Sequence, residues 1–182
     1  MSSEAALVLE AANFAAEKHK RQRRKDIEKT PYINHPLGVA RILSFEGGIT
    51  DTAVLQAALL HDTVEDTNTT FSELELHFGQ EVCKIVEEVT DDKTLPKEER
   101  KRKQIEHAPH CSNKAKLVKL ADKLYNLRDL ISSMPEGWTE QRVQEYFQWA
   151  SEVVRGLRGT NPVLEAKLDQ LFKDRGVAIN DL

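Results

Sequence analysis

The chain has 182 residues, of which 40% are hydrophobic and 31% charged, and its formal net charge is −4. This length allows one domain with its own core rather than two, and the composition excludes a disordered chain. The negative charge argues against broad nucleic-acid binding. The lack of a long apolar run or a signal-peptide pattern predicts a cytoplasmic protein without a membrane partner.

Apolar residues recur at helical spacing along the chain, whereas no alternating run of β-branched residues predicts a strand. We therefore expect an all-α fold in a single domain covering residues 1–182. Asp51 and Thr70 are expected to cap helices, and Pro36 and Pro162 suit first helical turns. The predicted helices cover residues 3–20, 36–45, 52–62, 70–77, 82–89, a stretch ending near 107, 113–131, 139–157 and 162–173. The charged segment 91–104 is predicted to be a loop running into the helix that ends near residue 107.

The helix predicted for residues 52–62 is the most apolar in the chain and ends in His61 and Asp62. An imidazole beside a carboxylate is unfavourable to bury without a partner, and a cation is a suitable partner. Taken alone, such a pair more often means that the histidine caps the helix and the aspartate faces solvent. The dipeptide therefore indicates a metal site only if further ligands lie near it.

Two other residues complete a candidate ligand set. His35 lies in the PYINHP loop before a predicted helix start, and Asp122 interrupts the apolar stripe of the helix at 113–131. Two imidazoles and two carboxylates suit Mn²⁺, Fe²⁺, Co²⁺ or Zn²⁺, and the lack of thiolates favours Mn²⁺. Four protein ligands leave positions open for water and substrate, so the set predicts a single ion that assists hydrolysis. We expect this metal-site core to span about residues 30–130.

Glu65 and Asp66 follow His61 and Asp62 at a spacing of four residues. If the helix continues, each carboxylate shares a face with a candidate ligand. Adjacent carboxylates near a cation can deprotonate a water molecule or protonate a leaving oxygen, which makes them candidate catalytic residues. The alternative is an acidic turn after a helix.

A basic run covers residues 18–25, where six of eight positions are Lys or Arg. It could be a solvated helix end or a nuclear-import patch. Arg24 and Lys25 precede His35 by about ten residues, which favours contact with substrate phosphates. Asn126 lies one helical turn beyond Asp122 and can face the same cavity.

The remaining histidines and both cysteines have no ligand spacing, so we expect surface or packing roles for them. These residues are His19, His77, His107, His110, Cys83 and Cys111.

Three segments, PYINHP, ALLHDTVEDT and KLADKLYNLRDL, resemble in this order the hydrolase domain of the RelA/SpoT proteins, within the HD-domain superfamily. The resemblance implies an HD-type helical bundle. It also implies Mn²⁺-dependent removal of the 3′-pyrophosphate from guanosine tetraphosphate or pentaphosphate, giving GDP or GTP and pyrophosphate.

The resemblance further implies which residues act. The metal ligands of the family correspond to His35, His61, Asp62 and Asp122, its Glu-Asp pair to Glu65 and Asp66, and its nucleotide contacts to Arg24, Lys25 and Asn126, with Arg142 and Tyr146 as further candidates. The chain departs from the bacterial pattern at the segment DIEKT, where a shorter glycine-containing turn is usual.

Several functions remain open at this point. The resemblance also implies removal of the 2′-phosphate of NADPH, so the small-molecule partner is a guanine nucleotide or NADPH. A nucleotidase acting on monophosphates would keep the same ion and fold, and a sensor would bind the nucleotide without turning it over. The oligomeric state is not predicted, because the apolar stripes of the last two helices could pack internally or against a second copy.

Overall fold

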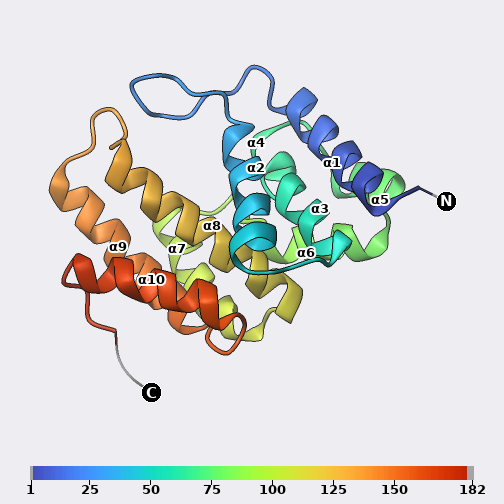
Figure 1. Ribbon diagram of the computed structural model, residues 1–182. Helices are drawn as coiled ribbons and strands as arrows, with labels where there is room; N and C mark the ends of the chain where they lie inside the picture. The colour runs from blue at the N-terminus through green and yellow to red at the C-terminus, as the bar shows by residue number, and fades with distance from the viewer. Residues whose placement is uncertain (1, 180–182) are drawn as a thin grey trace.

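The computed structural model describes residues 2–179 and is built from helices (Figure 1). Within this range it contains no strand, only an isolated bridge between Arg23 and Pro31, so the all-α expectation is confirmed. The α-helices are α1 (Glu4–Lys18), α2 (Asn34–Arg41), α3 (Thr52–Leu60), α4 (Thr63–Asp66), α5 (Phe71–Phe78), α6 (Gln80–Val89), α7 (Lys97–His107), α8 (Asn113–Ser132), α9 (Glu140–Arg155) and α10 (Pro162–Asp174). A π-helical turn, Ile42–Glu46, follows α2, and a short 3-10 helix, Ala108–His110, follows α7.

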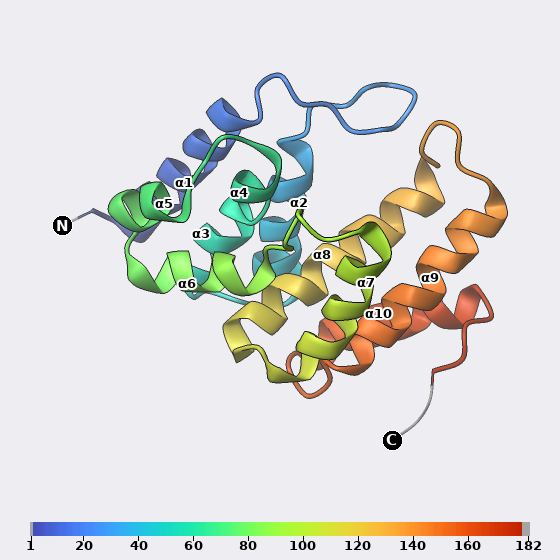
Figure 2. The same cartoon turned by 180° about the vertical axis from the view of Figure 1, so that it is seen from behind.

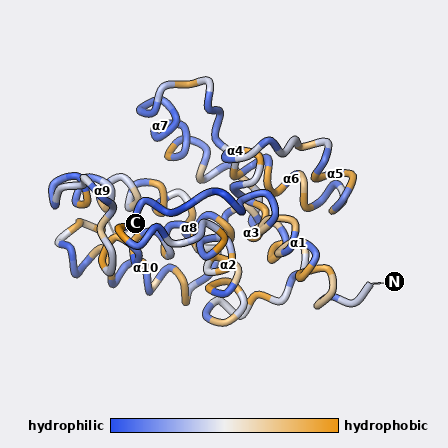
Figure 3. Tube along the Cα trace, turned by 90° about the horizontal axis from the view of Figure 1, so that it is seen from above, coloured by the Kyte–Doolittle hydropathy of each residue, from blue (hydrophilic) through white to orange (hydrophobic). Residues whose placement is uncertain are grey.

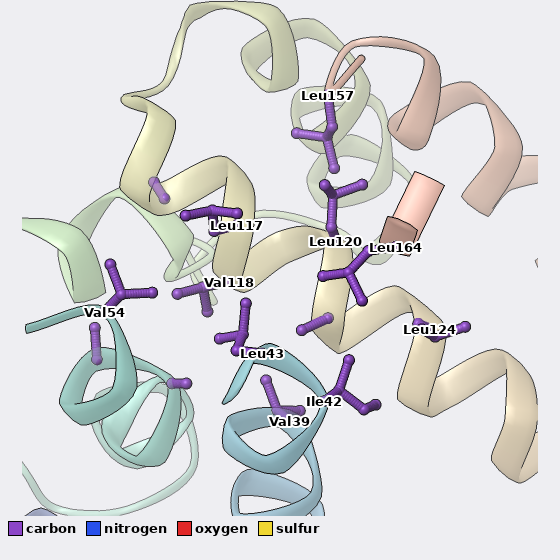
Figure 4. Packing of buried hydrophobic residues seen from close by; sticks show 14 of the residues in the cluster. Val39, Ile42, Leu43, Val54, Leu117, Val118, Leu120, Leu124, Leu157 and Leu164 are labelled. Atoms are coloured by element: carbon purple, nitrogen blue, oxygen red, sulfur yellow. The ribbon is translucent and has the colours of Figure 1, made fainter. Parts of the chain in front are cut away.

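The longest helix, α8, crosses the middle of the molecule (Figure 1). It packs against α2, α3 and α6 on one side and against α9 and α10 on the other. Figure 4 shows Val39 and Leu43 facing Val118 of α8, while Leu164 meets Leu120. All of these side chains are fully buried, so one hydrophobic core holds α8 in a fixed position.

Side-chain caps mark where several helices begin. Asp51 caps α3 and Thr70 caps α5 through oxygens that accept backbone N–H groups at 3.0 and 3.1 Å, as predicted. Ser112 caps α8 in the same way at 3.2 Å. These contacts satisfy N–H groups that a helix start leaves without partners.

The apolar helix α3 ends at Leu60, two residues before its predicted end. The His61 ring donates a hydrogen bond to the Ala58 carbonyl at 2.6 Å, and the Thr63 hydroxyl donates to the Leu60 carbonyl at 2.7 Å. A continuing helix would use these same carbonyls for its backbone bonds, so the side chains stop it. The helix therefore does not continue to Glu65 and Asp66, which was the condition for their sharing a face with the candidate ligands; the pair lies on the separate short helix α4.

The charged segment 91–104 is also more helical than predicted, because α7 begins at Lys97, directly after Pro96. Two acidic residues in its first turn suit the positive end of the helix dipole. Arg102 forms ion pairs with Glu99 and Glu106, one helical turn away in each direction. The prediction of a loop missed these short-range pairs.

Helix α7 is held from one side only. None of its residues, 97–107, is fully buried, and most of the segment is hydrophilic (Figure 3). Ile105 is half-buried and packs against the core. It lies beside α9 (Figure 2), where the Trp149 indole N–H donates to the Lys101 carbonyl at 3.1 Å.

Apart from these two segments, the predicted helix bounds agree with the structure to within two residues, counting the π-helical turn with α2. Cys83 is buried and Cys111 half-buried, and both are free thiols, which agrees with packing roles. Among residues 2–179, no helix is both long enough and apolar enough to cross a membrane.

Candidate metal centre

Four side chains from three parts of the fold converge on one point. The Nε2 atoms of His35 and His61 lie 3.2 Å apart. Asp122 Oδ1 is 2.9 Å from the first of these nitrogens and 3.2 Å from the second. Asp62 Oδ2 is 3.1 Å from His61 Nε2 and 3.5 Å from His35 Nε2. The structure therefore brings all four predicted ligand residues together.

The packing of α2, α3 and α8 on one another creates this convergence. His35 is in the first turn of α2, His61 and Asp62 follow the end of α3, and Asp122 is near the middle of α8. The two imidazoles are only 2% and 5% exposed, whereas the carboxylates are 17% and 18% exposed. The carboxylates thus form the more open side of the cluster.

The hydrogen bonds of the histidines leave both Nε2 atoms aimed into the cluster. Because a carbonyl only accepts, the contact of His61 Nδ1 with the Ala58 carbonyl requires the proton on Nδ1. Its Nε2 then carries a lone pair, which is the usual arrangement of a metal-binding histidine. In the described part of the chain, the buried Nδ1 of His35 has no hydrogen-bond partner. The contacts of His35 Nε2 with Asp122 Oδ1 and with the lone pair of His61 Nε2 therefore require a proton or a cation at this point.

Electrostatics of the cluster also favour a positive charge at its centre. Burial lowers the pKa of His61, but the charge of Asp62 and the hydrogen bond to Asp122 outweigh burial and raise the pKa well above its usual value. Burial likewise opposes ionisation of Asp122, but the charge of Lys123 and the hydrogen bonds from His35 and His61 together outweigh it and hold the pKa of that carboxyl well below its usual value. The aspartates therefore remain anionic and attract a cation to this point.

The distances within the cluster fit a bound divalent ion. Ligand atoms about 2.1 Å from a shared ion lie about 3.0 Å apart in octahedral and about 3.4 Å apart in tetrahedral coordination. The five distances between nitrogen and oxygen atoms given above run from 2.9 to 3.5 Å. Imidazole and carboxylate donors suit divalent transition metals. The site is therefore a candidate divalent metal centre, in which His35, His61 and Asp62 place ligand atoms within 4.8 Å of one another and Asp122, which contacts both imidazoles, is a fourth candidate ligand.

Two residues that the sequence did not single out support the carboxylates. The Tyr32 hydroxyl donates to Asp62 Oδ2 at 2.5 Å, and burial raises the pKa of this phenol, so it stays a donor. The Lys123 ammonium donates to Asp122 Oδ2 at 3.2 Å. Tyr32 belongs to the PYINHP segment and Lys123 adjoins a predicted ligand, so their positions in the sequence were the available signals.

Glu65 is suited to carry a proton near neutral pH. Burial, followed by the negative charge of Asp62, raises the pKa of this carboxyl from 4.5 to about 7. Its Oε1 accepts the backbone N–H of Asp91 at 3.0 Å, which fixes the direction of the side chain. A carboxyl with this pKa can give or accept a proton close to physiological pH.

Asp66 is held by two donors from other segments. Gln22 Nε2 donates to its Oδ2 at 3.3 Å, and Lys93 Nζ donates to its Oδ1 at 3.2 Å. The His19 ring contacts the amide oxygen of Gln22 at 2.7 Å, which keeps the amide nitrogen turned toward Asp66. No local pattern indicated the contacts of Asp66, because they join residues far apart in the chain.

Two adjoining cavities open beside the cluster. The inner cavity, of about 230 Å³, is lined by all four ligands, and the outer cavity, of about 330 Å³, is lined by Asp62 and Asp66. Glu65 lines both cavities. The space beside the metal centre therefore continues into a second compartment, and the pair is comparable in size to small-ligand sites.

Arg24 lies in the wall that the two cavities share. Its guanidinium forms an ion pair with Asp129 at 2.6 Å and lies over the ring of Tyr32, 5.6 Å from the ring centre. Asn126 lines both cavities and contacts Asp122 Oδ2 through its amide nitrogen at 3.5 Å. These two predicted substrate contacts therefore face the cavities beside the metal centre.

The other predicted substrate contacts lie at different depths. Tyr146 lines both cavities, whereas Lys25 is exposed and lines the outer cavity but not the inner one. Arg142 lines neither of them, and its guanidinium lies over the Trp138 ring at 4.0 Å from the ring centre. Of the two residues expected to contact substrate phosphates, Arg24 therefore lies beside the candidate metal centre and Lys25 lies farther out.

The fold and the site together define a helical protein with a histidine and aspartate metal centre. A family model for the HD domain matches residues 11–149. The chain therefore belongs to the HD domain family, as the resemblance of its three segments predicted.

Individual proteins of the HD domain family show which members this chain is most similar to among those compared. The chain is 84% identical to guanosine-3′,5′-bis(diphosphate) 3′-pyrophosphohydrolase MESH1 of Xenopus tropicalis, over 98% of this chain and 100% of the relative. It is 72% identical to the Homo sapiens protein of the same name, again over 98% of this chain and 100% of the relative. A solved structure described as a metazoan ortholog of SpoT that hydrolyzes ppGpp superimposes with a TM-score of 0.94 at 55% identity, covering 98% of this chain and 100% of that one.

Proposed function

We propose that this protein is a divalent-metal-dependent phosphohydrolase that removes the 3′-pyrophosphate of guanosine-3′,5′-bis(diphosphate), or of the corresponding pentaphosphate. The observation that carries the proposal is the convergence of two imidazoles and two carboxylates beside a pair of cavities. The activity in the names of the highly similar relatives supports this choice of substrate.

The reaction adds water across one phosphate ester. The water oxygen forms a bond to the phosphorus next to the ribose, the bond from that phosphorus to the 3′ oxygen breaks, and the 3′ oxygen takes up a proton. The products are GDP or GTP and pyrophosphate. A bound divalent ion supplies Lewis acidity that polarises the phosphate and lowers the pKa of water.

The residues of the chain supply positioning and proton transfer. In this proposal Asp66, held in place by Gln22 and Lys93, orients the attacking water. Glu65, with a pKa of about 7, carries the proton between the water and the leaving 3′ oxygen. Arg24 neutralises phosphate charge, as a guanidinium does most effectively.

Further contacts complete the proposed substrate site. Asn126 and Tyr146 line both cavities beside the metal centre and would contact the nucleoside, while Lys25 and Arg142 would act from farther out. We take Mn²⁺ as the ion, because the donors are imidazoles and carboxylates without a thiolate. We also propose that residues 1–182 work as one domain and that the protein is cytoplasmic, since its proposed substrate is a water-soluble nucleotide.

The direct test is pyrophosphate release from guanosine-3′,5′-bis(diphosphate) with Mn²⁺ present. His61→Ala removes a ligand and Asp66→Ala removes the residue that orients water, so each is expected to lower turnover at least about 100-fold. His110→Ala is the control, because this exposed histidine lines neither cavity. A His61→Ala protein with the wild-type circular dichroism spectrum and the wild-type rate would contradict the proposal.

A substrate panel separates the proposed activity from its alternatives. Guanosine-3′,5′-bis(diphosphate), NADPH and deoxynucleoside monophosphates are compared under the same Mn²⁺ conditions. Preference for NADPH would reassign the same site to 2′-phosphate removal, and preference for monophosphates would indicate a nucleotidase. Binding without product in a single-turnover assay would indicate a sensor.

A further inference from the structure

His19 is a buried histidine at the end of α1 to which the proposed mechanism gives no role. The residue is only 1% exposed. Its Nδ1 contacts Gln22 Oε1 at 2.7 Å, whereas its buried Nε2 has no hydrogen-bond partner in the described part of the chain. An apolar ring would fill the same space without an unpaired polar atom, which costs about 1–3 kcal/mol when buried. Packing alone therefore does not account for an imidazole at this position.

The hydrogen bonds that start at His19 run in one direction, toward Asp66. An ionised carboxylate only accepts hydrogen bonds, so the contact of Gln22 with Asp66 Oδ2 at 3.3 Å uses the amide nitrogen. The amide oxygen of Gln22 then faces His19 and accepts the proton on Nδ1. Without this donor, the amide could turn over and present its oxygen to the carboxylate. His19 therefore determines which end of the amide meets Asp66.

The side chain of Gln22 is the part of this residue that still needs fixing. Its backbone N–H donates to the His19 carbonyl at 2.8 Å, and its carbonyl accepts the Tyr32 N–H at 3.0 Å. The other donor to Asp66, the Lys93 ammonium, belongs to a side chain that is 51% exposed, so water competes for that contact. The chain from His19 through Gln22 is therefore the more rigid support of Asp66.

The ring of His19 also packs against Tyr32. The two ring centres lie 4.8 Å apart, and the ring planes are inclined by 41°. The Tyr32 hydroxyl donates to Asp62, one of the candidate ligands. One imidazole thus acts in two ways: its N–H supports Asp66 through an amide, and its ring supports Asp62 through a phenol.

We infer that His19 and Gln22 are positioning residues for hydrolysis, because together they hold the Asp66 carboxylate in the direction from which it orients the attacking water. This inference rests on the proposed function, since it takes Asp66 to orient water. His19 lines neither cavity beside the metal centre. Loss of its N–H therefore slows the chemical step and leaves the affinities for substrate and ion unchanged.

The test removes the N–H of His19 and keeps a ring. His19→Phe still packs against Tyr32 but has no donor for Gln22. At saturating Mn²⁺ we expect kcat for guanosine-3′,5′-bis(diphosphate) to fall at least about 10-fold, as is typical when a supporting hydrogen bond beside a metal site is lost. KM and the Mn²⁺ dissociation constant should stay within about two-fold. His110→Phe, the same change at an exposed histidine, should leave all three unchanged.

Two further variants test the chain from either end. His19→Asn restores a donor without the ring, because the asparagine amide nitrogen takes the place of Nδ1. It should keep kcat within about three-fold of wild type but bind Mn²⁺ more weakly, since Tyr32 loses its neighbour. Gln22→Met keeps the side-chain length but cannot donate to Asp66, so it should lower kcat as His19→Phe does. Gln22 is only half-buried, so this variant tests the chain even if His19→Phe does not fold.

Double variants show whether the effect passes through Asp66. His19→Phe should lower kcat no further when it is added to Gln22→Met or to Asp66→Ala, because the chain is already broken in both backgrounds. A general loss of structure would lower kcat again in each. Wild-type kcat in both His19→Phe and Gln22→Met overturns the inference, and so does a further loss of about 10-fold in the Asp66→Ala background.

Crystal structures separate failure of this inference from failure of the proposed function. In His19→Phe the Asp66 carboxylate should be rotated from its direction in the wild-type protein, whether or not the nucleotide is hydrolysed. If the carboxylate rotates but the wild-type protein releases no pyrophosphate, the positioning chain stands and the proposed hydrolysis fails. If the wild-type protein is active and the carboxylate keeps its direction in His19→Phe, the hydrolysis stands and the chain is wrong. An unrotated carboxylate overturns the chain in either case.

Discussion

The two nitrogens of the His61 ring have different partners, and this division prepares the ring for a metal. Nδ1 donates to the Ala58 carbonyl in the last turn of α3, which leaves the lone pair of Nε2 facing the cluster. The same hydrogen bond helps to end the helix. One contact therefore sets both the local backbone and the orientation of a candidate ligand.

Residue types and their spacing, with the family resemblance, were enough to single out the four residues that cluster at the candidate metal centre and the Glu-Asp pair near them. The contacts that orient them were not predictable, because they arise only on folding. Tyr32 meets Asp62 across 30 positions, and Gln22 meets Asp66 across 44. No local pattern relates side chains at such separations.

Glu65 gives a prediction about pH and stability. This carboxyl ionises near pH 4.5 in the unfolded chain and near pH 7 in the folded protein. Its contribution to folding is therefore complete below pH 4.5 and is lost as the pH rises through 7. In EDTA at pH 8, we expect Glu65→Gln to raise the free energy of unfolding by about 1–3 kcal/mol, with no gain at pH 4. Denaturant unfolding at both pH values measures this difference.

The control is Glu10→Gln, the same change at an exposed position of α1, for which no pH-dependent gain is expected. A gain from Glu65→Gln that is equal at pH 4 and pH 8 would show that ionisation is not its cause. The same variant should lose turnover, so stability and activity change in opposite directions.

At the scale of helices, apolar periodicity located nearly every element, because burial of one face dominates helix formation in proteins. It failed at two places where side chains act on the backbone or on each other. Thr63 and His61 bind carbonyls at the end of α3, and the ion pairs of Arg102 favour a helix without any buried face. Neither effect appears in a hydrophobic pattern.

The contact of α2 with α8 depends on the absence of a side chain at Gly38. A Cβ atom added there would lie 2.2 Å from Cε2 of Tyr125, whose ring packs edge-on against His35. Gly38→Ala must displace this ring, so we expect a loss of about 1–3 kcal/mol in the free energy of unfolding. Because the displaced ring supports a candidate ligand, Mn²⁺ should also bind more weakly. Denaturant unfolding and Mn²⁺ titration measure the two effects.

A double-mutant cycle tests the cause. In a Tyr125→Ala background the clash is absent, and alanine favours a helix over glycine by about 1 kcal/mol. Gly38→Ala should then stabilise the protein rather than destabilise it. The same destabilisation in both backgrounds would mean that the Tyr125 ring is not the obstacle.

At the scale of the whole molecule, the metal centre joins three packed helices, so ion binding is expected to be linked to folding. An ion at 100 times its dissociation constant adds about 2.7 kcal/mol to stability, which raises Tm by about 5–10 °C for a chain of this size. We expect Mn²⁺ to produce this shift and EDTA to reverse it. Thermal unfolding followed by circular dichroism measures both.

Asp122→Ala should remove most of the Mn²⁺-dependent shift, since it removes one ligand from the central helix. His77→Ala, at an exposed position on α5, should keep the full shift. Equal shifts in the two variants would place the stabilising ion elsewhere in the protein.

The fold class could be predicted from the sequence, whereas the packing of the helices around the cavities could not. The all-α expectation followed from periodicity, and the resemblance of three segments implied the HD-type bundle, which membership in the HD domain family now confirms. The cavities were not predictable, because each depends on how distant helices meet. Tyr146, for example, lines three of them from a single position on α9.

The exposed position of helix α7 affects which sequence changes the protein can tolerate. Most of its residues 97–107 lie outside the core, so substitutions at its exposed positions, unlike substitutions at Ile105, leave the core packing unchanged. Yet its first two turns supply Lys97 and Lys101 to a third cavity, of about 470 Å³, which Tyr146 also lines. Substitutions on this one surface helix therefore change the wall of that cavity while the residues of the candidate metal centre stay the same. A comparison of the relatives at positions 97 and 101 would show how much this cavity wall varies among them.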